Sequence, residues 1–281
     1  MKLAFTATPS LARFAPMLWR GRVEDAFALA RELGYDGVEI HLRSPEDVDR
    51  TALRALQDKY NLGVPTLGTG MAAGEDGLTF SDPDAAVRRR AVARIQEHIR
   101  LATSLGSAVT LGLIRGRLGR DEHRPARRAA MLACLDECCR LAAAEGVTLL
   151  LEPINRYEID DLATLDQAAE VIRELGAPNL KLLADTFHMN IEEVDLGTSL
   201  RRHASLLGHV HLVDSNREVP GHGHIDMKAI LQVLLETGFQ GYLSFEVLPL
   251  PEPRQAALDG MRTVQKILQP LSTWESLRHA V

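Results

Sequence analysis

The segment LKLLADTFHMNIEEV, residues 180–194, contains a short apolar run followed at once by polar side chains and a helical pattern. An apolar run of this length, bounded by polar residues, is typical of a strand that is buried in a parallel sheet. Asp185, Thr186 and His188 stand where the strand ends. The segment therefore predicts one strand–helix unit with a carboxylate and an imidazole at its junction.

The same unit recurs along the chain. Apolar runs predict strands at residues 2–6, 37–40, 64–68, 108–113, 147–152, 180–185, 209–214 and 242–247. Helical spacing predicts helices at residues 22–34, 47–60, 83–106, 123–145, 163–176, 191–203, 226–238 and 252–271. Eight units without a linker favour an α/β fold with a single domain over residues 1–281, a (β/α)8 TIM barrel. A doubly wound sheet is less favoured, because no glycine-rich phosphate loop follows the first strand.

The composition excludes several classes of protein. Of the 281 residues, 46% are hydrophobic and 25% are charged, and the net charge is -6, so there is no basic footprint for nucleic acid. Neither a run of eighteen apolar residues nor a signal peptide is found, which predicts a cytoplasmic protein with no membrane partner. Cys134, Cys138 and Cys139 suit neither a disulfide framework nor a zinc site and are expected to be free thiols.

Four residues of metal-binding type occupy the ends of strands five to eight, where the chemistry of a TIM barrel lies. They are Glu152, Asp185, His211 and Glu246. Successive members lie about one strand–helix unit apart, which predicts a common height at the barrel mouth. Three carboxylates at one place raise one another's pKa, and a divalent cation removes that cost. The oxygen-rich set favours one Mn²⁺, with Mg²⁺, Co²⁺ or Zn²⁺ as alternatives.

Further polar side chains near these strand ends suit a substrate with many hydroxyl groups. Glu158 follows strand five, His188 follows strand six and Arg217 follows strand seven, although Glu158 and Arg217 could instead pair with each other. His209 shares the inward face of His211 and is favoured as a support for that residue.

Other residues near the barrel mouth are left open. Glu39 and His41, at the end of strand two, either line the pocket or form a strand-end salt bridge. Phe5, Phe14, Met17 and Trp19 cluster near the first strand and its loop and are expected to cover the mouth or close over a substrate. The segment 271–281 either frays or packs on a neighbour.

Several longer motifs carry a resemblance to a known family. The second half contains LLLEPINRYE (149–158), LADTFHMNIEEV (183–194), GHVHLVDSNREVPGHGHID (208–226) and SFEVLPLP (244–251), and the first half adds GEDGLTFSDPDAAVRRRAV (74–92). These segments resemble the xylose isomerase-like TIM barrels and, within them, the ketose 3-epimerases of the tagatose/allulose group. The segment GLIRGR (112–117) is most similar to the 5-keto-L-gluconate epimerase type.

The resemblance implies an activity and a role for each matching residue. Glu152 and Glu246 correspond to the catalytic pair that transfers the proton at C3 of a ketose, and they are also metal ligands. Glu158, His188 and Arg217 correspond to substrate-binding groups. Family members are often dimers or tetramers, which implies a homo-oligomer acting on a sugar or sugar acid.

The guanidinium groups of Arg115 and Arg117 suit a carboxylate, so the 5-keto-L-gluconate/D-tagaturonate pair is the leading substrate candidate. A neutral ketose 3-epimerase of the allulose/tagatose type, a sugar isomerase and an inosose dehydratase are the alternatives. An abasic-site endonuclease is a remote alternative, because the ends of strands three and four lack the extra histidines of a three-metal cluster.

Overall fold

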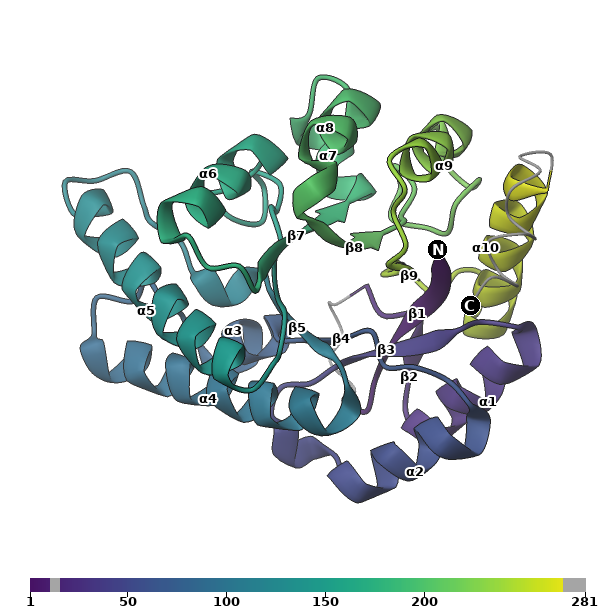
Figure 1. Cartoon of the computed structure of the whole chain (residues 1–281), viewed down its shortest axis with the longest axis horizontal. Coiled ribbons are helices and arrows are strands. Elements are labelled where there is room, and N and C mark those ends of the chain that lie inside the picture. The colour runs from purple at the N-terminus through teal and green to yellow at the C-terminus, as the bar shows by residue number, and fades with distance from the viewer. Residues whose placement is uncertain (11–15, 270–281) are drawn as a thin grey trace.

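The computed structural model describes residues 1–10 and 16–269 and shows a closed barrel of parallel strands surrounded by helices (Figure 1). The barrel strands follow one another in chain order, and β1 pairs with β9 to close the sheet. Their bounds are β1 (Lys2–Thr8), β3 (Gly37–His41), β4 (Thr66–Gly68), β5 (Ala108–Leu111), β6 (Leu149–Leu151), β7 (Leu180–Asp185), β8 (Leu207–His211) and β9 (Tyr242–Phe245). A short strand, β2 (Trp19–Arg20), pairs with the end of β1. The predicted TIM barrel is confirmed.

The helices that cover the barrel begin and end close to the predicted residues. They are α1 (Val23–Leu33), α2 (Arg50–Tyr60), α4 (Ala85–Leu105), α5 (Arg124–Ala144), α6 (Leu165–Leu175), α8 (Leu196–His203), α9 (Met227–Glu236) and α10 (Pro253–Leu268). Single 3-10 turns are η1 (Pro45–Asp47), η2 (Leu113–Arg115) and η3 (Ala204–Leu206). Phe14, residues 271–281 and the predicted end of the last helix at residue 271 lie outside the described residues.

Two helices were not predicted, α3 (Gly70–Asp76) and α7 (Thr186–Glu192). The helix expected at residues 191–203 is divided between the end of α7 and the whole of α8. Asp195 is the reason, because its Oδ1 accepts the backbone N–H of Thr198 at 2.6 Å and so caps a new helix. The prediction of one continuous helix there was wrong.

Alternation along the strands separates an apolar outer face from a polar interior. Val38 and Ile40 of β3 belong to the hydrophobic core that the helices share. Between them Glu39 points the other way, and its Oε2 lies 2.9 Å from Nε2 of His209 on β8. Because β3 and β8 are not neighbours, this contact crosses the inside of the barrel. The fold therefore directs the polar strand residues toward its axis.

Two other expectations concern the chain as a whole. The three cysteines are buried and free, as predicted. Within the described residues, every helix is too short or too polar to cross a membrane. The cytoplasmic location and the homo-oligomeric state stay predictions.

The closure between β1 and β9 generates a prediction about stability. Tyr35 is buried, its ring meets Phe5 and Phe245 edge to face, and its hydroxyl donates to the carbonyl of Ala257 at 2.7 Å. Tyr35→Phe keeps the ring packing and leaves that carbonyl without its partner. We expect urea unfolding to show a loss of about 1–2 kcal/mol of stability. Tyr157→Phe, at a side chain that is 76% exposed, is the matched control and should change nothing measurable.

Candidate active site

Four side chains from consecutive strands meet at the barrel mouth. Glu152 follows β6, Asp185 ends β7, His211 ends β8 and Glu246 follows β9. One ligand-type atom of each lies within 4.8 Å of the others. Nδ1 of His211 is at the centre, 3.5 Å from Oε1 of Glu152, 3.6 Å from Oδ2 of Asp185 and 3.6 Å from Oε2 of Glu246. The structure thus brings together the four residues that strand spacing selected.

The atoms that face one another in this cluster are buried and lack hydrogen-bond partners. Three of these atoms have no hydrogen-bond partner among the described residues: Oε1 of Glu152, Oδ2 of Asp185 and Nδ1 of His211. Buried polar atoms are almost always paired, so three unpaired atoms aimed at one point need an explanation. A cation held between them would pair all three. The donor set, three carboxylates and one imidazole, fits a divalent metal of the Mn²⁺ or Mg²⁺ kind.

Electrostatics at the cluster support the same reading. Burial raises the pKa of Glu246 to about 7, and the nearby charges of Glu152 and Asp185 add to this rise against the opposing effect of His211. Without a cation, this carboxyl group therefore resists full ionisation at neutral pH. A bound divalent ion would favour the ionised form of every carboxylate in the cluster.

Asp185 explains why a carboxylate stands at the junction of strand and helix. Its Oδ1 accepts the backbone N–H groups of Phe187 at 2.7 Å and His188 at 3.2 Å, and so caps α7. This cap fixes the carboxylate so that Oδ2 faces His211. Thr186 accepts the N–H of Val213 at 2.8 Å and donates to its carbonyl at 2.6 Å, which ties the end of β7 to the segment after β8.

A buried carboxylate inside the barrel orients His211. Oε1 of Glu39 lies 3.0 Å from Nε2 of His211 and 2.8 Å from Nε2 of His41, while its Oε2 contacts His209. Since Nε2 of His211 is occupied, Nδ1 is left for the cluster. The sequence left two roles open for Glu39 and His41, a place in the pocket wall or a salt bridge at the strand end. The two residues do contact each other, and Glu39 is fully buried and contacts three histidines. His41 also lines the pocket. His209 supports His211 in two ways: it shares Glu39 with that residue, and its ring meets the His211 ring edge to face, 5.3 Å between centres.

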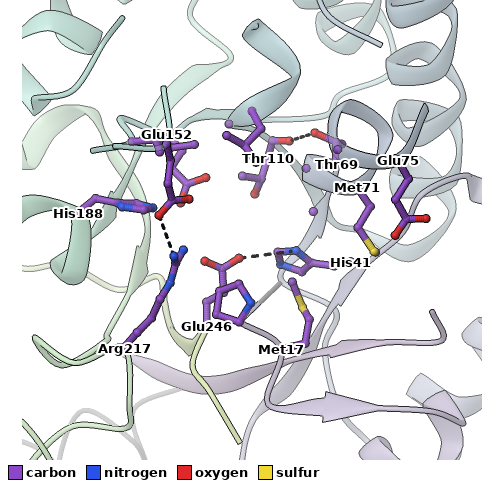
Figure 2. Close-up of a pocket in the computed structure, with 18 residues that line it drawn as sticks. Met17, His41, Thr69, Met71, Glu75, Thr110, Glu152, His188, Arg217 and Glu246 are labelled. Atoms are coloured by element: carbon purple, nitrogen blue, oxygen red, sulfur yellow. Dashed lines mark hydrogen bonds and ion pairs between the residues drawn. The ribbon is translucent and has the colours of Figure 1, made fainter. Parts of the chain in front are cut away.

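A cavity of about 490 Å³ opens above the cluster (Figure 2). This volume lies in the usual range for small-molecule sites. The cavity has polar groups on the barrel side, among them Glu152, Glu246 and His41, and methionine side chains elsewhere on its wall. The full lining is Pro16, Met17, His41, Gly68, Thr69, Gly70, Met71, Gly74, Glu75, Thr110, Gly112, Leu113, Glu152, Ile154, Glu158, His188, Arg217 and Glu246. Met17 is thus part of the wall, as expected. Phe5 and Trp19 are not, because Phe5 is buried in the hydrophobic core and Trp19 packs against that core.

Glu158, His188 and Arg217 all line this cavity. Nη1 of Arg217 donates to Oε1 of Glu158 at 2.7 Å, so the pair that the sequence left open does form. The guanidinium also lies over the ring of Phe187, 4.7 Å from its centre. Arg217 has a positive φ of 65°, which is strained for a residue with a long side chain. Such strain is typical of a side chain held in place for a functional reason.

The structure corrects the expectation for Arg115 and Arg117, because neither lines the cavity. Arg115 is fully buried and donates to the carbonyls of Glu152 at 2.8 Å and Asp161 at 3.0 Å. Arg117 is exposed and donates to the carbonyl of Glu158 at 2.6 Å. Both guanidinium groups hold the backbone of the loop after β6.

Two residues that sequence reasoning missed shape the site. Asn155, in the EPINRYE motif, contacts both His188 and Glu158. Gly112, after β5, passes so close to Glu152 that a Cβ there would lie 2.5 Å from Oε2 of that residue. The motif offered a signal for Asn155, since it stands between residues that were selected. The close approach of Gly112 is visible only in three dimensions.

Comparison with known proteins agrees with this geometry. The model of the family described as "Xylose isomerase-like TIM barrel" matches residues 27–267. The chain belongs to this family. A curated L-ribulose 3-epimerase from Mesorhizobium japonicum is 35% identical over 229 residues, which cover 81% of this chain and 76% of the relative. A ketose 3-epimerase from Arthrobacter globiformis is 31% identical over 220 residues, which cover 77% of this chain and 74% of the relative.

Solved structures point the same way. The structure of an L-ribulose 3-epimerase superimposes with a TM-score of 0.84 at 29% identity and covers 98% of this chain and 97% of that one. The resemblance to ketose 3-epimerases stated from the motifs is confirmed. The chain is accordingly an enzyme of the carbohydrate isomerase class.

Gly112 generates a prediction about the cluster. In Gly112→Ala the new methyl group would lie 2.5 Å from Oε2 of Glu152 and 3.0 Å from Cδ1 of Ile154, so both side-chain ends must shift. The backbone of Gly112, with φ -105° and ψ -104°, also lies outside the regions that a residue with a Cβ favours. We expect Mn²⁺ affinity, measured by calorimetric titration of metal-free protein, to fall about 10- to 100-fold. The melting temperature is measured on the same samples, so that loss of affinity is separated from loss of stability.

The matched control is Gly74→Ala, since Gly74 lies in α3 on the same cavity wall and a Cβ there meets nothing within 4 Å. This variant should bind Mn²⁺ like the native protein. Equal affinity in both variants would show that Glu152 does not hold the ion.

Proposed function

We propose that this protein is a metal-dependent 3-epimerase of neutral ketoses, with Glu152 and Glu246 as the proton-transfer pair. The observation that carries the proposal is the position of these two glutamates, which share one cation-sized cluster and both line the same cavity. The relatives named as ketose 3-epimerases support it.

Inversion at C3 of a ketose needs a base on one face of the carbon and an acid on the other. Glu152 and Glu246 come from β6 and β9, which are separated by two strands, so their carboxyl groups approach the cavity from different sides. One accepts the C3 proton while the other delivers a proton to the opposite face. When bound, a divalent cation stabilises the negative charge that develops on the sugar oxygens, a contribution of several kcal/mol.

The remaining polar groups of the cavity bind and orient the sugar. His188 and Arg217 both reach the cavity and supply donors for the carbonyl oxygen O2, where negative charge grows during proton removal. Glu158 accepts from a sugar hydroxyl while it holds Arg217 in place. Met17, Met71 and Ile154 cover apolar parts of the open-chain sugar and keep water away from the reacting carbon.

The charges of the cavity favour a neutral ketose over the keto acid suggested by GLIRGR. Among the described lining residues, Arg217 is the single arginine or lysine, and it is already paired with Glu158. The acidic lining residues are Glu75, Glu152, Glu158 and Glu246. A substrate carboxylate would meet repulsion without a free cationic partner. We therefore place L-ribulose and D-fructose/D-allulose ahead of 5-keto-L-gluconate/D-tagaturonate.

The alternative enzymes differ from a 3-epimerase in the substrate atom that reacts. One of them, an abasic-site endonuclease, also differs in the number of metal ions. A sugar isomerase or an inosose dehydratase would use the same cluster, so only products distinguish them. An abasic-site endonuclease would need several ions. Within the described residues the two clusters of ligand-type side chains share His211, and the second, Glu39 with His209 and His211, is closed by its own hydrogen bonds. This favours a single ion, and Mn²⁺ is our proposed choice.

Isotope exchange with a substrate panel tests the reaction. Purified enzyme with Mn²⁺ in D₂O is incubated with L-ribulose, D-fructose and D-tagaturonate, and deuterium is located by NMR. We expect deuterium at C3 and the C3 epimer with at least one neutral ketose, and loss of both after EDTA treatment. Exchange confined to D-tagaturonate would restore the keto-acid reading. Exchange at C1 with aldose formation would indicate an isomerase instead.

Glutamine variants test the two-base assignment. In Glu152→Gln and Glu246→Gln we expect epimer formation to fall by about 10²–10⁴-fold, because each variant lacks one of the two proton carriers. Each should still exchange the C3 hydrogen of one epimer with solvent, and the two variants should exchange opposite epimers.

Both variants are assayed at saturating Mn²⁺, with bound metal measured, so that loss of a ligand is separated from loss of a base. If both variants exchanged the same epimer, one glutamate would be a ligand only.

A further inference from the structure

The amide of Asn155 has a fixed orientation beneath the cavity. Its side chain is 1% exposed, and its Oδ1 accepts the backbone N–H of Tyr157 at 3.0 Å. A backbone N–H can only donate, so this contact identifies the oxygen end of the amide. The nitrogen end then points toward Nδ1 of His188 at 2.7 Å and Oε1 of Glu158 at 3.1 Å.

This orientation determines which nitrogen of His188 carries the proton. An amide NH₂ group has two donors and no acceptor, so Nδ1 of His188 must accept. An imidazole whose Nδ1 accepts carries its proton on Nε2. His188 is only 2% exposed, yet it lines the cavity. Its ring reaches the pocket beside Glu152 (Figure 2). The Nε2–H group is therefore available as a donor to a sugar oxygen.

We propose that Asn155 is a positioning residue that holds His188 as the Nε2–H tautomer, so that this ring donates to the substrate carbonyl oxygen. The inference rests on the proposed function, because it gives the tautomer a role in binding negative charge at O2. The second amide hydrogen restrains Glu158, whose same oxygen accepts from Arg217. Asn155 thus orients the ring of His188 and holds the Glu158–Arg217 ion pair in place.

Histidine ring ¹⁵N NMR tests the tautomer without any assay of activity. Protein labelled with ¹⁵N in histidine is loaded with diamagnetic Mg²⁺, and the His188 signals are assigned by their absence from His188→Gln. We expect a neutral ring protonated at Nε2. A ring protonated at Nδ1, or at both nitrogens, would overturn the proposal even if the enzyme is an active epimerase.

Kinetics test whether the tautomer matters. Asn155→Asp is nearly isosteric and keeps an oxygen for the N–H of Tyr157, yet its second oxygen accepts from His188 and draws the proton to Nδ1. We expect kcat/KM to fall by about 10²–10³-fold, as when one donor to a developing oxyanion is lost. In the His188→Gln background the glutamine amide keeps its donor whether residue 155 is Asn or Asp. There, Asn155→Asp should lower kcat/KM by less than about 3-fold.

Asn155→Asp also introduces repulsion between the new carboxylate and Glu158. The Glu158→Gln background removes that repulsion, and Asn155→Asp should lower kcat/KM there as well. An equal loss with and without His188 would show that Asn155 acts through the loop alone and would refute the proposal. If the native enzyme epimerises no ketose, the proposed function fails, and the NMR result still decides whether Asn155 sets the tautomer.

Discussion

Three carboxylates and one imidazole share a buried point at the barrel mouth, and the repulsion between the carboxylates constrains what can surround them. Buried negative charge is stable only where positive charge or hydrogen-bond donors compensate it. The polar interior of the barrel supplies part of that compensation, since His211 stands between the three carboxylates and Glu39. The carboxylate of Glu39, on the far side of His211, raises the pKa of that histidine. The cluster is therefore arranged to accept a cation from the open side.

The buried Arg115 belongs to the same balance of charge. Burial lowers the pKa of Arg115 to about 10, while the nearby carboxylates of Asp161 and Glu152 oppose that fall, so Arg115 keeps its charge at neutral pH. Its guanidinium donates to the carbonyl of Glu152, the residue that carries one of the clustered carboxylates. A buried guanidinium beside the backbone of Glu152 both fixes the loop and offsets the negative charge of the cluster. The position of Arg115 is thus explained by the cluster without any contact to substrate.

The parts of the structure that follow from periodicity were predictable from the sequence. Regular strand–helix units place Glu152, Asp185, His211 and Glu246 at one rim, because each successive strand of a parallel barrel ends there. Side chains in short irregular segments were not predictable in the same way. Arg115 and Arg217 both follow strands, yet the 3-10 turn of η2 buries the first, while the positive φ of the second directs it into the cavity. Helices α3 and α7 have seven residues each, too few for a periodic pattern.

Three polar side chains of the cavity wall and the buried Asn155 form one connected network that joins three segments of the chain. Asn155 and Glu158 come from the loop after β6, His188 from the helix after β7 and Arg217 from the loop after β8, and each contacts another member. Residues in such a network act together, so their separate substitutions are not additive. An isolated arginine or histidine on a mobile loop would pay conformational entropy each time a sugar binds. Linking the loops before the sugar arrives removes that cost, and it explains why an uncharged asparagine stands at the buried centre of a charged site.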